Sequence, residues 1–291
     1  MSLGRIIFYP NYFYYAGIAR TTEPSLTGET YTCSGGETSG AIYDLIDSRR
    51  TNVVTTDSNG VGADFTVDVD LIGNITNADF AILDNHNLTT ADGDIRIQHG
   101  GSDVDISYAY SGTLGEQLTN ESIYISSNWV ATPEDGVILI YPFDSNITDN
   151  NWEVNIRDNG ANNFNADVTM GELAIGVSCS PSFSPERTVV ETKAYQGIDI
   201  RTTNAGQKYG FKRYGKQQIW KLEWEYLSST DVTNIETMFD VVEGSMYPFW
   251  IDLGETSSPT LYFVRFLQDR LDFKKKTADC YGLQIMIEEE L

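Results

Sequence analysis

The stretch of sequence that decides the fold runs from Phe65 to Gly73 and reads Phe-Thr-Val-Asp-Val-Asp-Leu-Ile-Gly. From Phe65 to Leu71 an apolar residue stands at every second position, and Thr or Asp stands between. Side chains of a β-strand point alternately to the two faces of a sheet, so this spacing predicts a strand with one buried and one solvated face. The chain is therefore expected to be mainly β.

The rest of the first 180 residues shows the same pattern in shorter pieces. Apolar residues alternate with polar ones around Ile95 and again from Trp152 to Ile156. The run Val137–Tyr141 is continuously apolar, which predicts a strand buried on both faces, and Pro142 is expected to end it. Many short strands separated by turn residues are typical of a β-sandwich. We predict a sandwich domain over residues 1–180, with residues 1–20 as a candidate N-terminal arm.

A second domain is predicted over residues 186–291, after a linker, Ser180–Pro185, that has few residues able to pack. Apolar residues alternate from Trp220 to Tyr226, which predicts a strand. Ser228 then offers an N-cap for one helix with helically spaced apolar residues, and Gly244 is placed to end that helix at the C′ position. Further strands are predicted over residues 247–251, 261–266 and 283–287. This domain is expected to be smaller and β-rich, with one helix.

Charge is spread unevenly along the 291 residues, which carry a net charge of −23. Residues 1–180 hold six Arg and no Lys against 25 acidic residues, whereas residues 181–291 hold 13 basic and 17 acidic residues. This change supports the boundary near residue 180. An acidic surface repels phosphate backbones, so a sequence-specific nucleic-acid partner is not expected. No stretch approaches the ~20 apolar residues of a membrane helix, so no membrane partner is expected either.

Two segments resemble known families. Asp47-x-x-x-Thr51 followed by Val67-Asp-Val-Asp-Leu71 resembles the discoidin, or galactose-binding-like, pattern, although here Ile72 separates Leu71 from Gly73. This resemblance covers about a third of the chain and implies a jelly roll at the N-terminus. It also implies that Asp44 and Asp47 lie where such a domain holds a cation, which makes calcium the one candidate cofactor.

The segment from Tyr214 to Trp224, with Met238-Phe239, Gly244 and Pro248-Phe249-Trp250, is similar to phage tail proteins of the distal-tail and minor-tail type. That resemblance implies a structural virion protein of a tail tip or baseplate, made in the host cytoplasm. Its partners would be other tail proteins and further copies of itself in a ring, six-fold or alternatively three-fold. Such proteins have no catalytic residues, so we expect no enzyme.

The predicted oligomer interface lies in the second domain. Trp220, Trp224, Phe249 and Trp250 concentrate large aromatic area there, and aromatic residues are enriched both in cores and at interface centres. The strand over residues 283–287 is expected to lie at a sheet edge and to pair with the next copy. Repulsion between the acidic N-terminal halves would hold these at the periphery of the ring.

Other candidate sites are less marked in the sequence. Trp129 and Tyr108 are candidates for stacking on a glycan, with core packing as the alternative. Four loop acids could bind calcium, but their spacing fits neither an EF-hand nor a nonapeptide repeat, so solvated side chains are expected: Asp92, Asp94, Asp103 and Asp105. His86 and His99 are expected in turns or on the surface. The three cysteines, Cys33, Cys179 and Cys280, form no CxxC motif and predict reduced thiols.

Two other classes of function stay open at this point. The first is a carbohydrate-binding module that attaches a particle or an enzyme to surface glycans. The second is a glycoside hydrolase, because 42 acidic residues make pairs of carboxylates unavoidable. The nucleophile, zinc and P-loop motifs are all missing from the sequence, which favours the structural class.

Overall fold

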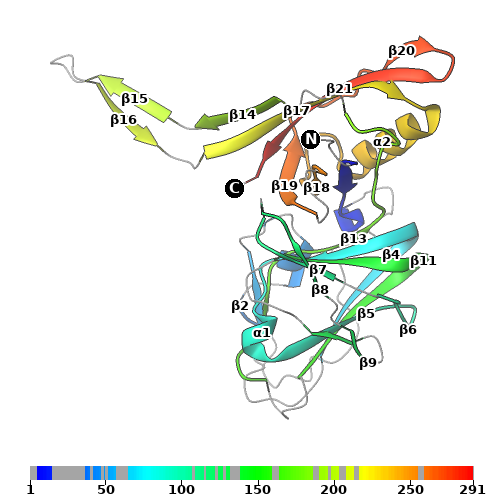
Figure 1. Cartoon of the computed structure of the whole chain (residues 1–291). Helices are drawn as coiled ribbons and strands as arrows, with labels where there is room; N and C mark the ends of the chain where they lie inside the picture. Colours follow the sequence, from blue (N-terminus) through cyan, green and yellow to red (C-terminus); the bar gives the residue numbers. More distant parts are fainter. Residues whose placement is uncertain are drawn as a thin grey trace.

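The computed structural model describes residues 5–14, 37–39, 42–46, 49, 52–56, 65–106, 109–114, 116–121, 124–126, 129–131, 138–158, 164–185, 190–195, 198–202, 208–212, 216–254 and 259–290. The molecule is mainly β, with two large antiparallel sheets and one long helix (Figure 1). This confirms the predicted fold class, a β-sandwich followed by a β-rich domain with a single helix.

The larger sheet belongs to the N-terminal part of the chain. Its order is β13 (Leu173–Gly176), β4 (Phe65–Leu83), β11 (Ile138–Asp158), β5 (Gly93–His99), β10 (Trp129–Ala131) and β9 (Tyr124–Ser126), with β6 (Ser102–Asp103), β7 (Ala109–Gly112) and β8 (Thr119–Glu121) attached. A small sheet joins β12 (Thr169–Met170), β3 (Val54–Thr56) and β2 (Glu37–Ser39). Three short helical turns complete this part: η1 (Tyr12–Tyr14), η2 (Ile42–Ile46) and α1 (Leu88–Ala91).

The alternation that predicted this sheet appears directly in its packing. Val67 and Val69 of β4 are buried, while Asp68 between them is half-buried. Val67 lies opposite Val154 of β11, and Val154 lies opposite Ile97 of β5, so one apolar row crosses three strands. Cross-strand apolar pairs of this kind set the register of a sheet that has one buried face.

Pro142 does not end a strand, contrary to the sequence prediction. Strand β11 continues through it to Asp158, with register shifts between Pro142 and Asn151. Pro142 lies opposite Phe80 of β4, and β7 pairs with β11 from Ile138 to Ile140. A proline adds no N–H to a strand ladder, but its ring did not prevent this strand from continuing past it.

The second sheet has the order β1 (Ile7–Tyr9), β18 (Phe249–Asp252), β19 (Leu261–Phe266), β21 (Cys280–Glu289), β17 (Lys216–Leu227) and β14 (Val190–Tyr195), with β20 (Lys274–Thr277) paired to β21. Trp220 and Trp224 of β17 are buried, as their spacing predicts. Tyr226 is 61% exposed instead, because a register shift between Trp224 and Leu227 turns Leu227 into the core. The prediction that Tyr226 shares their face was wrong.

The helix α2 (Ser229–Val241) has a defined cap at each end. At its start the Ser228 hydroxyl accepts a hydrogen bond from the Asp231 amide (3.1 Å), and the Asp231 carboxylate accepts one from the Ser228 amide (2.9 Å). At its end Glu243 (φ 50°) and Gly244 (φ 67°) are both left-handed, and their amides bond to the carbonyls of Asp240 and Phe239. This is a Schellman motif in which Gly244 stands at C″, one residue beyond the predicted C′ position.

Strand β1, near the start of the sequence, belongs to the second sheet. Phe8 of β1 lies opposite Ile251 of β18. Its ring lies 6.4 Å from that of Trp224 and 6.0 Å from that of Phe249, and its exposed fraction is 1%. Its backbone exchanges two 2.9 Å hydrogen bonds with Cys179 at the end of the sandwich domain. The N-terminal strand therefore ties the two parts of the chain together.

The two sheets also share a buried core. One apolar cluster joins side chains of the sandwich with side chains of the second sheet: Phe80, Ile82, Ile138, Ile140, Trp250, Leu261 and Phe263. The Leu118 amide donates to the Pro259 carbonyl at 2.8 Å. Burial of apolar area between the sheets stabilises their contact in the way a domain core is stabilised.

The segment Ser180–Pro185 is packed, contrary to the expectation of a linker with few packing residues. Pro181 and Pro185 are buried. The Ser182 amide and hydroxyl each donate to the Asp231 carboxylate at 2.9 Å, and the Phe183 carbonyl accepts from Trp224 Nε1 at 3.0 Å. The domain boundary near residue 180 itself stays a prediction.

Candidate binding and assembly site

The four residues predicted at an oligomer interface lie in the interior of the chain. The exposed fractions of Trp220, Trp224, Phe249 and Trp250 are all 2% or less. The ring of Trp220 packs on Tyr262, with centroids 4.8 Å apart. An interface between copies would therefore be made by other residues.

The strand predicted as the pairing edge is not at an edge. Strand β21 pairs with β17 on one side and with β19 and β20 on the other. On that second side β20 pairs with residues 280–282 and β19 with residues 287–289. Between them the Met286 carbonyl accepts from the Leu267 amide at 3.0 Å and the Met286 amide donates to the Gln268 side chain at 3.1 Å, so the chain itself occupies this side of the strand. The edge prediction for residues 283–287 was wrong.

The metal and glycan candidates are not brought together. Asp44 is half-buried in η2, and Asp47 lies outside the described residues. Trp129 is placed only by its backbone in β10, and Tyr108 lies outside the described residues. Over the described ranges there is no group of three or more His, Cys, Asp or Glu residues that could hold a metal ion. No helix in those ranges is long and apolar enough to cross a membrane.

Of the four loop acids, Asp105 is exposed as predicted, Asp92 and Asp103 are half-buried, and Asp94 is buried. Asp94 is 1% exposed and forms an ion pair with Arg157 at 3.2 Å, so the expectation of a solvated side chain was wrong there. Asp103 accepts a hydrogen bond from the Gln98 amide at 2.6 Å, on the neighbouring strand of a hairpin. These carboxylates hold strands together and are not directed toward one shared site.

The two histidines have different surroundings. His86 lies in the connection between β4 and α1, which fits the prediction of a turn residue, but it is buried there, and its Nδ1 accepts a hydrogen bond from the Leu88 amide at 3.3 Å. His99, at the end of β5, lies with Nδ1 3.0 Å from Asp149 Oδ2. Burial alone would raise the pKa of Asp149, but hydrogen bonds from His99 and from two backbone amides lower it.

Three acidic residues lie close together on the outer face of the sandwich sheet. Asn151 donates to Asp68 at 3.1 Å and to Asp70 at 2.6 Å, and Glu153 lies opposite Asp68 across the strand pair. Burial, followed by the charges of Asp70 and Glu153, raises the pKa of Asp68 to about 6. At neutral pH this face therefore carries closely spaced negative charge.

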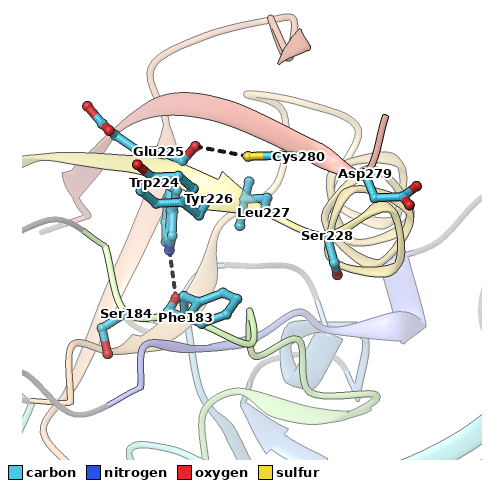
Figure 2. A pocket seen from close by; sticks show the side chains of 9 residues that line it. All are labelled: Phe183, Ser184, Trp224, Glu225, Tyr226, Leu227, Ser228, Asp279 and Cys280. Carbon is cyan, nitrogen blue, oxygen red and sulfur yellow. Dashed lines mark hydrogen bonds between the residues drawn. The ribbon is translucent and has the colours of Figure 1, made fainter. Parts of the chain in front are cut away.

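A groove of about 460 Å³ lies where the 180–185 segment meets the end of β17 (Figure 2). Phe183 and Tyr226 stand on its walls with exposed fractions of 59% and 61%, and the Cys280 thiol donates to the Glu225 carbonyl at 3.7 Å. The lining is mostly apolar, so the groove can receive an apolar group.

The hollow beside this groove is charged and internally paired. Lys276 forms an ion pair with Glu225 at 3.4 Å, and Arg270 forms one with Asp272 at 3.3 Å. The Lys276 ammonium also lies 5.5 Å from the centre of the Tyr226 ring. Exposed pairs of this kind contribute little to stability, about 0–1 kcal/mol, and they leave no strong net charge to attract a ligand.

An extended arm, which the sequence analysis missed, is the most distinctive surface of the molecule. Strand β14 and the start of β17 lead away from the body toward a hairpin of β15 (Ile198–Thr202) and β16 (Lys208–Lys212) (Figure 1). Residues 190–216, which we call the arm, hold six basic and two acidic residues. This local excess of basic residues in an acidic chain was the signal that could have revealed it.

Comparison with known proteins adds distant likenesses in structure. No family model matches the chain, and no curated protein sequence matches it. A chain from the virion of a native gene transfer agent (GTA) particle is similar with 15% identity and a TM-score of 0.30, over 38% of this chain and 95% of that one.

Two carbohydrate-binding modules of family 32 from Clostridium perfringens are also similar. The module CBM32-1 of a family 31 glycoside hydrolase is 14% identical with a TM-score of 0.32, over 49% of this chain and 89% of that one. The module of NanJ, solved in complex with galactose, is 14% identical with a TM-score of 0.27, over 49% and 88%. At these TM-scores the likenesses carry no functional assignment.

Proposed function

We propose that this protein is a structural component of a phage-type tail, in the tail tip or baseplate region. In this role it assembles as a ring, and its sandwich domain faces other tail proteins or the host surface. The proposal is carried by one observation: the arm extends from the body as a two-stranded ribbon (Figure 1).

A ribbon of two strands is marginally stable in water by itself, because it has no third strand or helix to cover a face. Within the strands that the structure describes, β15 pairs with β16 and with no other strand. Assembly supplies the missing contacts when the ribbon lies on a neighbouring molecule. An arm of this kind suits a protein whose ordered form is the assembled one.

The body of the protein is packed as a rigid spacer would be. Its two sheets share a buried core, and β1 and the packed 180–185 segment bind the sandwich to the second sheet at two further places. Buried acidic groups serve this packing: Asp94 is paired with Arg157, and Asp231 accepts hydrogen bonds from Ser228 and Ser182. These acids have structural partners, which supports a scaffold and not a reaction centre.

Purified particles from the host that carries this gene provide the test. We expect mass spectrometry to find the full chain in tails at a fixed stoichiometry, and electron microscopy to place it in a ring of six-fold or three-fold symmetry. Absence of the chain from intact particles contradicts the proposal.

The full chain on a glycan array separates the alternatives that the sequence left open. Binding to a defined sugar at micromolar concentration would favour a carbohydrate-binding module. Saccharide turnover that one Asp→Asn or Glu→Gln change abolishes would identify a glycoside hydrolase. We expect neither result.

A further inference from the structure

The arm carries charge of the opposite sign to the rest of the chain. Its six basic residues are about a third of the 19 in the whole chain, and with two acidic residues they give a net charge of +4. Residues 1–180 carry six basic and 25 acidic residues, a net charge of −19. One chain therefore combines a basic segment with an acidic domain.

The strands of the arm lie apart from the acidic domain of the same chain (Figure 1). Among the described strands, β14 pairs with β17 alone, and the hairpin beyond it leads away from the sandwich (Figure 1). The arm also holds four aromatic residues: Tyr195, Tyr209, Phe211 and Tyr214. Tyr, Phe and Arg are enriched at protein interfaces, where aromatic residues supply apolar contact area. The composition is that of a contact surface.

We propose that the arm of one copy docks on the acidic sandwich domain of a second copy. This inference rests on the proposed assembly into a ring and names the two surfaces that meet in it. Opposite charge accelerates encounter and disfavours wrong partners, because like-charged surfaces repel. The sandwich of an identical copy is present at equal stoichiometry and carries the complementary charge.

The reach of the arm fits this contact. Strands β14 and β15 contain six and five residues. At a rise of ~3.3 Å per residue they extend for about 35 Å, which is comparable to the diameter of a domain of this size. Each copy would dock its own arm on the sandwich domain of one neighbour and would bind the arm of another neighbour. Such a head-to-tail contact closes into a ring when the rotation between copies divides a full turn.

Charge reversal in the full chain tests the docking. The variant Lys208→Glu/Lys212→Glu reverses two arm charges, and Lys274→Glu/Lys275→Glu makes the same change on β20, outside the arm. In sedimentation velocity we expect the arm variant to weaken self-association at least ~10-fold and the β20 variant to leave it unchanged. Wild-type association should also weaken between about 0.1 M and 1 M salt, as the screening length falls from ~10 Å to ~3 Å.

Carbodiimide cross-linking identifies the two surfaces, because it joins lysine amines to carboxylates. In a mixture of ¹⁴N-labelled and ¹⁵N-labelled full chain, we expect mixed-isotope links between arm lysines and acidic residues of positions 1–180. Links only to residues 217–291, association that is unaffected by the arm variant, or a wild-type chain that stays monomeric each overturn the docking.

A single-stranded oligonucleotide, dT30, tests the other class of partner for a basic aromatic ribbon. Binding of dT30 that the arm variant abolishes, with self-association unchanged, overturns the proposal in favour of nucleic acid. The location of the chain in particles is a separate measurement. A chain that occurs in tails but fails these tests refutes the docking alone, whereas a chain that docks through its arm but is absent from tails refutes the proposed function.

Discussion

Replacing Phe8 by alanine should lower the free energy of unfolding far more than the position of this residue near the start of the sequence suggests. The side chain is 1% exposed and its ring contacts Trp224 and Phe249, which both belong to the second sheet. The backbone bonds to Cys179 do not depend on the side chain, so the substitution removes the packing and leaves the strand in place.

The expected loss follows from burial and from the cavity. Truncation of a buried phenylalanine to alanine typically costs about 3–5 kcal/mol, which includes lost transfer energy and an unfilled cavity. The two aromatic neighbours place Phe8 in the upper part of this range, because each close ring pair contributes about 0.5–1.5 kcal/mol beyond area burial. We expect a decrease of about 4–5 kcal/mol in the free energy of unfolding.

Urea unfolding followed by tryptophan fluorescence measures this loss in the full chain. Trp152 reports on the sandwich, and Trp220, Trp224 and Trp250 report on the second sheet, so a shared core predicts one common transition. Phe183→Ala is the matched control: its ring is 59% exposed, and its change should stay within about 0.5 kcal/mol. A loss below about 1 kcal/mol for Phe8→Ala, or two separate wild-type transitions, would refute the reasoning.

Three further substitutions test local contacts by thermal unfolding. In Gly176→Ala the new Cβ would lie 2.4 Å from a backbone carbonyl oxygen, so we expect a loss of about 1–3 kcal/mol. Gly282→Ala, whose nearest contact is a flexible lysine at 3.3 Å, should lose less, and equal losses would contradict the steric argument. Asp231→Ala removes the capping box and the hydrogen bonds to the 180–185 segment, for about 2–3 kcal/mol at pH 7. Burial raises the pKa of Asp231 but its hydrogen bonds lower it more, so the carboxylate stabilises the fold above about pH 4 and the difference from wild type should narrow in stronger acid. Asp68→Asn should stabilise the protein by about 1 kcal/mol at pH 7, after allowance for solvent screening, and should have no effect near pH 4. The gain follows from a pKa of Asp68 raised to about 6, which makes the charged form unfavourable in the fold.

Local pattern was enough to predict elements whose structure depends on neighbours in sequence. The alternation at Val67 and Val69 predicted the buried face of β4, and Trp220 with Trp224 predicted that of β17. Ser228 predicted the start of α2, because a cap needs only the residues of the first turn.

Long-range pairing was beyond such patterns. Nothing in the sequence of Ile7–Tyr9 shows whether this strand joins the sandwich sheet or the second sheet, because an apolar triplet fits either. The aromatic area of Trp250 likewise predicted either a core or an interface, and only the fold shows that Phe263 covers it. The face of Tyr226 was predicted wrongly, because a register shift depends on the facing strand and leaves no mark in the alternation of one strand.

The pairing of Phe8 with Ile251 also constrains the order in which the chain can fold during synthesis. The first strand emerges from the ribosome 243 residues before its partner. At ~5–20 residues per second, β1 waits about 12–50 s for β18. Through that interval an apolar strand is exposed without its partner, and contacts of such large sequence separation also form slowly. The second sheet can therefore close on β1 only after β18 has left the ribosome, which makes the pairing of Phe8 with Ile251 a late step in folding.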